Sequence, residues 1–431
     1  MNNRISLQTG IAIVIANMIG TGVFTSLGFQ LVDIDSVFVI LMLWLIGGIA
    51  ALCGALTYGE LGAALPRSGG EYNFLSQIYH PSVGFIGGWV SATVGFAAPT
   101  ALVCMTFGIY SESIFPSLDA QFLAIALLLL ATAIHTHSVW MGGGFQRIFT
   151  FLKVLLVCVF ILLAFILGDA QPISSILPQM SDLGDMLSPA FAVSLIYVSY
   201  AYTGWNAGTY LTNELENPQT NLPKALIIGT AAVTIIYVLL NFAFLYTAPM
   251  EALKGEVEIG YISATYMVGK SGGKIMAGVL ALLLISTASA MVFAGPRVLM
   301  VMGEDMNIFR FLSHKNKVGV PVRAILFQSA ISLMFILSGT FEEVLVYAGF
   351  VLASTTFITV AGVFVLRLRK PDLPRPYRTF GYPFTPSIFL VLVGWTLIFL
   401  LVNKPSESFA GVLTMFIGWL VYQLGKKKLF S

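Results

Sequence analysis

The sequence predicts an all-α membrane protein with about twelve transmembrane helices, and both its composition and its apolar segments indicate this class. Hydrophobic residues make up 57% of the 431 residues and charged residues only 10%, whereas about 25% of the residues in a soluble domain are charged. Apolar runs recur along the whole chain, and they reach the roughly 20 residues that a helix needs to cross a hydrocarbon core of about 30 Å. The chain therefore crosses a membrane many times.

Twelve segments are long and apolar enough to serve as spans. The first follows only one basic residue, Arg4, and lacks a small-residue cleavage site, so we interpret it as a span and not as a signal peptide. A single transmembrane domain covers residues 1–431. We expect its spans near residues 8–31, 36–62, 83–110, 120–137, 147–168, 189–213, 224–248, 273–302, 320–338, 342–367, 384–402 and 407–424.

Basic residues are distributed unevenly between the two sides of this topology. Twelve spans place both termini on one side, and of the 22 Lys and Arg residues only Lys254, Lys270, Lys274 and Lys404 fall on the other, with Lys153 inside a span. Because cytoplasmic loops are enriched in Lys and Arg, we expect both termini in the cytoplasm and the protein in the cell (inner or plasma) membrane. The basic residues are divided among short loops, so the lipid bilayer is the expected partner and nucleic acid is not.

The sequence contains no pattern typical of an enzyme or a metal site. Cys53, Cys104 and Cys158 fall inside predicted spans without CxxC spacing, and the histidines of HTH at 135–137 are isolated. No Ser, His and Asp set, phosphate-binding loop or H-E-x-x-H pattern is present. We therefore expect no catalytic residues, no cofactor and no metal.

Two spans contain interruptions. In the first, NMIGTGVF at 17–24 places Gly20 and Gly22 around Thr21, and each glycine weakens a helix by about 1 kcal/mol. In the sixth, the interruption is TGWN at 203–206. Small residues of this kind also serve close helix packing, but unwound backbone within a membrane requires protein or a water-filled cavity around it.

The two interruptions each open a group of five spans, which is typical of inverted-repeat transporters. Repeat one would cover about 8–168 and repeat two about 189–367, with additional helices at about 384–424. This repeat follows from topology, since the two halves are not visibly homologous. Pro99 and Pro296 occupy corresponding spans, the third and the eighth, and each should kink its helix.

Four motifs, in this order, carry a resemblance that covers nearly the full length. They are IGTGVF at 19–24, YGELGAALPRSGGEYNFL at 58–75, YTGWN with its continuation ELENPQTNLPKA, and RKPDLPRPYRTFGYP at 369–383. The chain resembles the amino acid, polyamine and organocation (APC) superfamily, closest to the L-type amino acid transporter and bacterial amino acid exchanger group. The resemblance implies a LeuT-like 5+5 fold with broken helices 1 and 6, and secondary active transport by alternating access.

The resemblance also implies where an amino acid would bind. Half-helix N-termini attract its carboxylate and exposed carbonyls its ammonium. The N–H groups of Gly20, Thr21 and Gly22 would hold the carboxylate, and carbonyls near Met18, Ile19, Tyr200 and Thr203 the ammonium. Tyr200 corresponds to an aromatic gate over the substrate, although it could also be a buried aromatic without that role. The implied substrate-binding set is Met18, Ile19, Gly20, Thr21, Gly22, Tyr200, Ala201, Thr203, Gly204 and Asn206.

Lys153 lies well within the fifth span, where an unpaired ammonium is costly. In sodium-independent relatives a lysine at this place substitutes for a sodium ion. The resemblance implies that Lys153 bridges the first span near Gly20 to Ser286, Thr287 or Ser289 on the eighth. The alternative is a lysine whose stem reaches to the cytoplasmic surface.

The expected function is exchange of small neutral L-amino acids without sodium. A proton-coupled importer, a carrier of cationic amino acids or polyamines, a channel and a nutrient sensor are the alternatives; a cationic substrate would need an acidic pocket residue, and none lies deep in a span. Tyr200, with Arg67 paired to Glu60 or Glu214, would form the gates. L-type relatives bind a heavy subunit through a cysteine between spans 3 and 4, but SESIFPSLD at 111–119 has none, so no disulfide-linked heavy subunit is expected.

Overall fold

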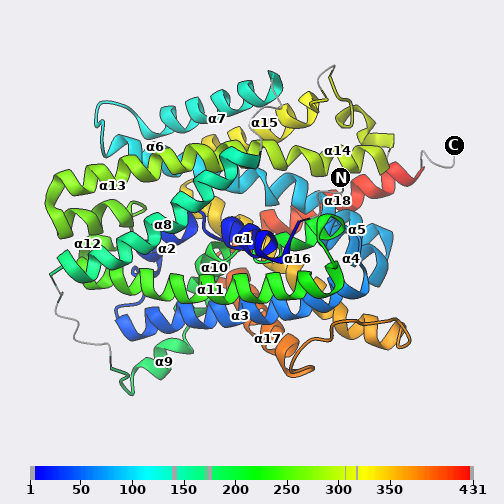
Figure 1. Cartoon of the computed structure of the whole chain (residues 1–431), viewed down its shortest axis with the longest axis horizontal. Helices are drawn as coiled ribbons and strands as arrows, with labels where there is room; N and C mark the ends of the chain where they lie inside the picture. Colours follow the sequence, from blue (N-terminus) through cyan, green and yellow to red (C-terminus); the bar gives the residue numbers. More distant parts are fainter. Residues whose placement is uncertain are drawn as a thin grey trace.

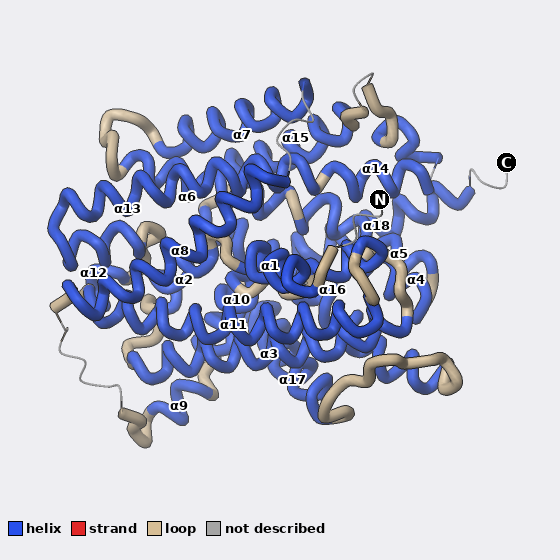
Figure 2. The backbone as a smooth tube through the Cα atoms, in the orientation of Figure 1, coloured by secondary structure: helices blue, strands red, loops and turns tan. Residues whose placement is uncertain are grey.

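Helices joined by short loops make up the part of the chain that the structure describes, as Figure 2 shows. The structure is a computed structural model that describes residues 5–137, 143–169, 171, 177–305, 307–316 and 319–427. Within these ranges the only β-type pairing is an isolated parallel bridge between Ile5 and Leu215. Its hydrogen bonds run from Ile5 N to Glu214 O (2.7 Å) and from Glu216 N to Ile5 O (2.9 Å).

The helices follow the predicted order of spans. The first half of the chain contains α1 (Leu7–Met18), α2 (Gly22–Gln30), α3 (Val37–Ala64), α4 (Gly70–Ile78), α5 (Pro81–Val90), the π-helix η1 (Ser91–Gly95), α6 (Ala97–Glu112), α7 (Ala120–His137) and α8 (Gly143–Leu167). The second half contains α9 (Asp182–Met186), α10 (Pro189–Ala201), the 3-10 helix η2 (Ala207–Glu214), α11 (Pro218–Thr247), α12 (Met250–Leu253), α13 (Ile259–Ala294), α14 (Pro296–Asp305), η3 (Asn307–Leu312), α15 (Val322–Ser338), α16 (Phe341–Arg369), α17 (Phe384–Asn403) and α18 (Pro405–Lys427).

The described residues provide a helix for each of the twelve expected spans. Nine helices are long and apolar enough to cross a membrane, and α1 with α2 forms a tenth span that is bent by 40°. The helices α10 and α15 are apolar but shorter. The prediction of an all-α membrane protein with broken helices 1 and 6 is therefore confirmed.

Local sequence signals begin several of these helices. The side chains of Ser6, Ser36 and Ser188 accept hydrogen bonds from backbone N–H groups in the first turns of α1, α3 and α10. Thr340 and Glu343 form a reciprocal capping box at the start of α16. Such caps satisfy N–H groups that a helix cannot satisfy itself, so they fix where these spans begin.

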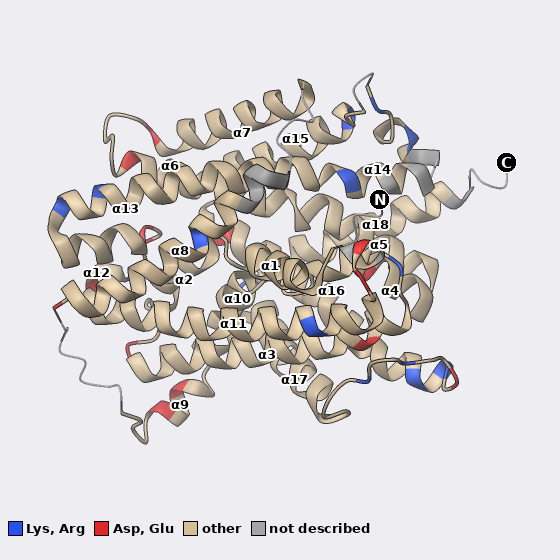
Figure 3. Ribbon diagram, in the orientation of Figure 1, with Lys and Arg blue, Asp and Glu red and all other residues tan. Residues whose placement is uncertain are grey.

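The long helices share one direction. Figure 1 shows α3, α6, α11 and α13 lengthwise, with α9 and α12 at one end of the bundle and α4, α5, α14 and the end of α18 at the other. We call this second end the terminal face. The helix α1 is seen almost end-on in the same view, so it is strongly tilted relative to the long helices. Lys and Arg gather toward the terminal face, whereas α9 at the opposite end carries acidic residues (Figure 3).

Spans 3 and 8 are interrupted near the predicted prolines. In span 3 the π-helix η1 gives way to α6 just before Pro99, and in span 8 α13 gives way to α14 at Pro296. The element α13 begins at Ile259, before the expected start near 273, because it joins two helices across a kink. Val268 and Gly269 have non-helical backbone angles, with φ +77° at Gly269, so the long helix of span 8 starts after Gly269, close to the expected position.

Candidate functional site

The two interrupted helices meet at their breaks. The helix α1 ends at Met18 and α2 begins at Gly22, while α10 ends at Ala201. A Cβ atom added to Gly22 would lie 2.6 Å from the Ala201 Cα, so glycine is what lets the two breaks touch. The Tyr237 hydroxyl on α11 lies 2.5 Å from the Met18 carbonyl oxygen and 3.2 Å from that of Ala201. A third helix thus joins the two breaks.

The N-terminus of α2 has the chemistry of an anion site. Thr21 precedes the helix without capping it through its side chain, and the first N–H groups of any helix lack partners within it. Together with the helix dipole, such free N–H groups favour a carboxylate. This agrees with the role expected of the stretch from Gly20 to Gly22.

A cavity of about 470 Å³ lies against both breaks, within the usual range for small-molecule sites. Every residue that the sequence proposed for substrate binding lines it: Met18, Ile19, Gly20, Thr21, Gly22, Tyr200, Ala201, Thr203, Gly204 and Asn206. Spans 3, 8 and 10, which the sequence could not resolve, contribute among others Ser91, Ala290 and Ala353. Binding by these residues stays a prediction.

The cavity extends from the breaks toward the terminal face. Its described lining includes nothing from α2 beyond Gly22, from α10 before Ser199 or from α13 before Thr287. It does include His135 and Phe293, near the ends of α7 and α13 that point toward the terminal face, and the exposed Asn17. On the opposite side of the breaks α2 contacts both α10 and α13, so the cavity is open toward one face.

Gly204 lies in the unwound segment of the sixth span, between α10 and η2. Its φ of +106° lies in the region that favours glycine, and an added Cβ would lie 2.6 Å from the Asn17 carbonyl oxygen. The backbone of one break therefore rests against the backbone of the other.

Gly204→Ala should destabilise the open form by about 1–3 kcal/mol, because the residue would be strained and Asn17 would have to move. We expect a lower Tm and slower transport in reconstituted vesicles. Gly184→Ala is the matched control, since a Cβ there would meet nothing within 4 Å. Equal behaviour of the two variants would show that the close approach does not matter.

Lys153 points into the protein. Only 8% of its surface is exposed, whereas its neighbour Phe151 on α8 is 66% exposed. Lys153 lines the large cavity and also a small adjoining one, together with Gly20 and Thr287. This placement argues against a side chain that reaches to the surface.

The three hydroxyl residues predicted as partners of Lys153 differ from one another in their contacts. Ser289 Oγ is 2.7 Å from His135 Nε2, and Ser286 Oγ is buried without a hydrogen-bond partner among the described residues. Thr287 Oγ1 donates to the Leu283 carbonyl, and its residue shares both cavities with Lys153. Lys153 thus lies at the same two cavities as Gly20 and Thr287, while Ser289 is engaged by His135.

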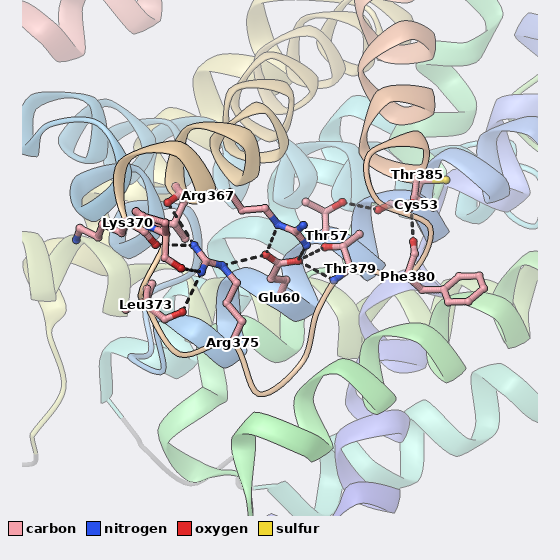
Figure 4. A network of polar contacts seen from close by, with 12 residues as sticks. Cys53, Thr57, Glu60, Arg367, Lys370, Leu373, Arg375, Thr379, Phe380 and Thr385 are labelled. Atoms are coloured by element: carbon pink, nitrogen blue, oxygen red, sulfur yellow. Dashed lines mark hydrogen bonds and ion pairs between the residues drawn. The ribbon is translucent and has the colours of Figure 1, made fainter.

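The expected ion pair of Arg67 with Glu60 or Glu214 is not formed in this open structure, so its role in closing the gate stays a prediction. Arg67 and Glu214 are exposed. The fully buried Glu60 instead accepts from Arg367, whose Nη2 is 2.6 Å from Oε2, and Arg375 Nε is 3.4 Å from Oε1. Figure 4 shows both arginines converging on this carboxylate.

The motif at 369–383 supplies further partners for the carboxylate of Glu60. Its chain folds back over α3, and the Thr379 N–H and hydroxyl each lie 2.7 Å from Glu60 Oε2 (Figure 4). The sequence suggested Arg67 because it is near in the chain. Partners more than 300 residues away could not be identified without the fold.

Sequence reasoning missed three polar side chains of this region: Glu71, His135 and Tyr237. No acidic residue was expected in the pocket because none lies deep in a span, but Glu71 at the start of α4 is buried and lines the cavity. His135 lies near the end of α7, as expected, but its burial was not foreseen. No sequence signal marks Tyr237 among the residues of α11.

Comparison with known proteins gives a consistent set of similarities. Residues 5–422 match the family described as Amino acid permease. The chain is 28% identical to the b(0,+)-type amino acid transporter 1 of Mus musculus, across 98% of this chain and 87% of that protein. It is 30% identical to the Large neutral amino acids transporter small subunit 2 of Mus musculus (99% and 81%) and 28% identical to the Asc-type amino acid transporter 1 of Mus musculus (99% and 81%).

Proposed function

Because the chain belongs to the amino acid permease family, in the L-type group of the APC superfamily, we propose that it is a secondary active transporter of small neutral L-amino acids. The observation that carries this proposal is the cavity between the two helix breaks. An amino acid presents one carboxylate and one ammonium. The α2 N-terminus suits the first, and the carbonyl groups where α1 and α10 end suit the second.

Neutral substrates are favoured by the charges of the cavity. Among the described residues Glu71 is the one acidic lining residue, and its oxygens already accept from Tyr58, Asn206 and Tyr210. A substrate with a second cationic group would compete with these donors. Transport of cationic amino acids or polyamines is therefore the second candidate function.

Exchange without sodium is the proposed mode of transport. It rests on Lys153, whose buried ammonium shares a cavity with Gly20 and Thr287 and can take the place of a bound cation between the first and eighth spans. Proton-coupled import is the alternative mode. A nutrient sensor on the same fold would bind an amino acid without moving it.

The terminal face is proposed to be cytoplasmic, since Lys and Arg gather there. The cavity would then be open to the cytoplasm. One relative is named a small subunit, which points to a partner subunit as the alternative to a chain that works alone. The segment 111–119 carries no cysteine, and we propose that any such partner is bound without a disulfide there.

Uptake of labelled alanine into proteoliposomes tests the proposal. Vesicles preloaded with alanine should take up label without sodium at least about tenfold faster than vesicles loaded with buffer. Uptake that follows a proton gradient into empty vesicles would favour the importer, and competition by arginine would favour a cationic carrier. Binding of alanine without any uptake would instead indicate a sensor.

A further inference from the structure

Glu71 is a buried acidic residue held by three donors from different parts of the fold. It lies in the first turn of α4 and only 3% of it is exposed. Its Oε1 is 3.0 Å from the Tyr58 hydroxyl and 2.5 Å from Asn206 Nδ2, and its Oε2 is 2.5 Å from the Tyr210 hydroxyl. All three partners donate to the same carboxylate.

These donors make a carboxylate the fitting group at this position. Burial of a charge is costly unless hydrogen bonds compensate it, and hydrogen bonds to an ionised acceptor are the stronger kind. The N-terminus of the nine-residue helix α4 adds a favourable dipole. No ion pair in the described part of the chain includes Glu71, so its neutral donors and this dipole hold it.

Two of the three donors lie in the sixth span at or after its break, and the third lies on α3, which packs against it. Asn206 lies in the break itself, Tyr210 lies in η2, and Tyr58 on α3 packs edge-on against Trp205 with ring centroids 4.7 Å apart. Glu71 therefore connects the break and the following limb of the sixth span to α3 and α4. A displacement of η2 relative to α4 would separate the hydrogen bond from Tyr210, and a displacement of the break would separate that from Asn206.

We propose that Glu71 is a positioning residue that stabilises the conformation whose cavity is open toward the terminal face. The inference rests on the proposed transport function, because it assigns a residue to one state of the cycle. In that state the carboxylate keeps Asn206 at the cavity wall and η2 against α4. Without the carboxylate, the open form loses contacts and the balance shifts to other conformations.

Glu71→Gln tests this inference sharply. A glutamine amide has one acceptor oxygen and one donor group, so at least one of the three donors would lose its acceptor. A buried donor without a partner costs enough to change an equilibrium about tenfold. Glu71→Asp keeps the carboxylate on a shorter side chain and should restore part of the effect. Glu216→Gln, at an exposed residue, controls for the loss of one acidic charge.

Thiol labelling reports the open state without depending on transport. The exposed Asn17, which lines the cavity, is changed to cysteine in a chain that carries Cys158→Ala; the other cysteines, Cys53 and Cys104, are buried. We expect a maleimide to label Asn17→Cys at least about twofold more slowly when Glu71→Gln is added, with partial recovery in Glu71→Asp and no change in Glu216→Gln.

The outcomes separate the two proposals. Unchanged labelling in Glu71→Gln would overturn the positioning role even if alanine exchange is measured. A wild-type protein that does not exchange alanine, but whose labelling slows as expected, would overturn the transport function and keep the role of Glu71 in stabilising the open form. If Cys53 and Cys104 become reactive, Glu71→Gln has unfolded, and Glu71→Asp decides: slower labelling than wild type supports the role, and equal labelling overturns it.

Discussion

Lys153→Met should reduce alanine exchange by about 10- to 100-fold and leave the protein at least as stable as the wild type. Methionine keeps the length of the side chain and removes its charge. The ammonium can bind the unwound backbone near Gly20 and the residues of α13, and interactions of a charged group with hydrogen-bond partners contribute about 1.5–3 kcal/mol. Initial exchange rates in proteoliposomes and Tm in detergent measure the two effects.

Stability should not fall, because the charge of Lys153 is buried among apolar residues. Its small cavity is lined by Phe24, Leu156, Leu280, Leu283 and Leu284, and the structure records no ion pair for Lys153 in the described ranges. Removing a buried and unpaired charge relieves a desolvation cost. We therefore expect a lower exchange rate together with an unchanged or higher Tm.

Two further variants control this result. Lys270→Ala removes a lysine that is exposed on α13 and should exchange alanine normally. Lys153→Arg keeps the charge and changes its shape, so it should retain part of the activity. Full exchange by Lys153→Met would contradict the assignment of this lysine to the site of an ion.

Glu60→Gln should lower the stability of the protein by about 3–5 kcal/mol, because it would leave two arginines side by side without their carboxylate. Arg367 and Arg375 both face Glu60, and the Thr379 N–H also donates to it. We expect a lower Tm and poor yield of folded protein. Thermal unfolding in detergent, followed by circular dichroism, measures the change.

Arg67→Ala and Glu214→Gln are the matched controls for this prediction. Both residues are exposed, and surface substitutions are usually within about 0.5 kcal/mol of neutral. If Glu60→Gln had the same Tm as the wild type, the arginines would have found other acceptors, such as the carbonyl groups that Arg375 already contacts. A large drop in Tm of Arg67→Ala would show that Arg67 makes a stabilising contact, as the gate prediction requires.

The sequence allowed the fold and the helix breaks to be predicted because both leave local signals. Apolar length marks the spans, and glycines mark Gly20, Gly22 and Gly204 as places where a helix can open. The cost of an ammonium within a span marked Lys153 as a residue that needs compensation, whereas its direction toward the first and eighth spans was implied by the resemblance. These are properties that a short stretch of chain has by itself.

The polar contacts between distant segments could not be predicted in the same way. Glu60 and Glu71 both lie in the motif at 58–75, at the end of the second predicted span or just after it. The fold gives them different surroundings: two arginines from the other end of the chain for Glu60, and three neutral donors for Glu71. Pairing of this kind depends on the packing of whole helices, so it leaves no trace in local sequence.

The isolated bridge at Ile5 has a mechanical consequence. Ile5 hydrogen-bonds to both Glu214 and Glu216 just before α1 begins, and at its other end α1 shares the Tyr237 hydroxyl with α10. The start of α1 is thus held to the end of η2 by backbone hydrogen bonds, and the end of α1 is joined through Tyr237 to the end of α10. Because η2 continues the sixth span beyond its break, a movement of the start of α1 has to be accompanied by a movement of the end of η2, unless the bridge at Ile5 opens first.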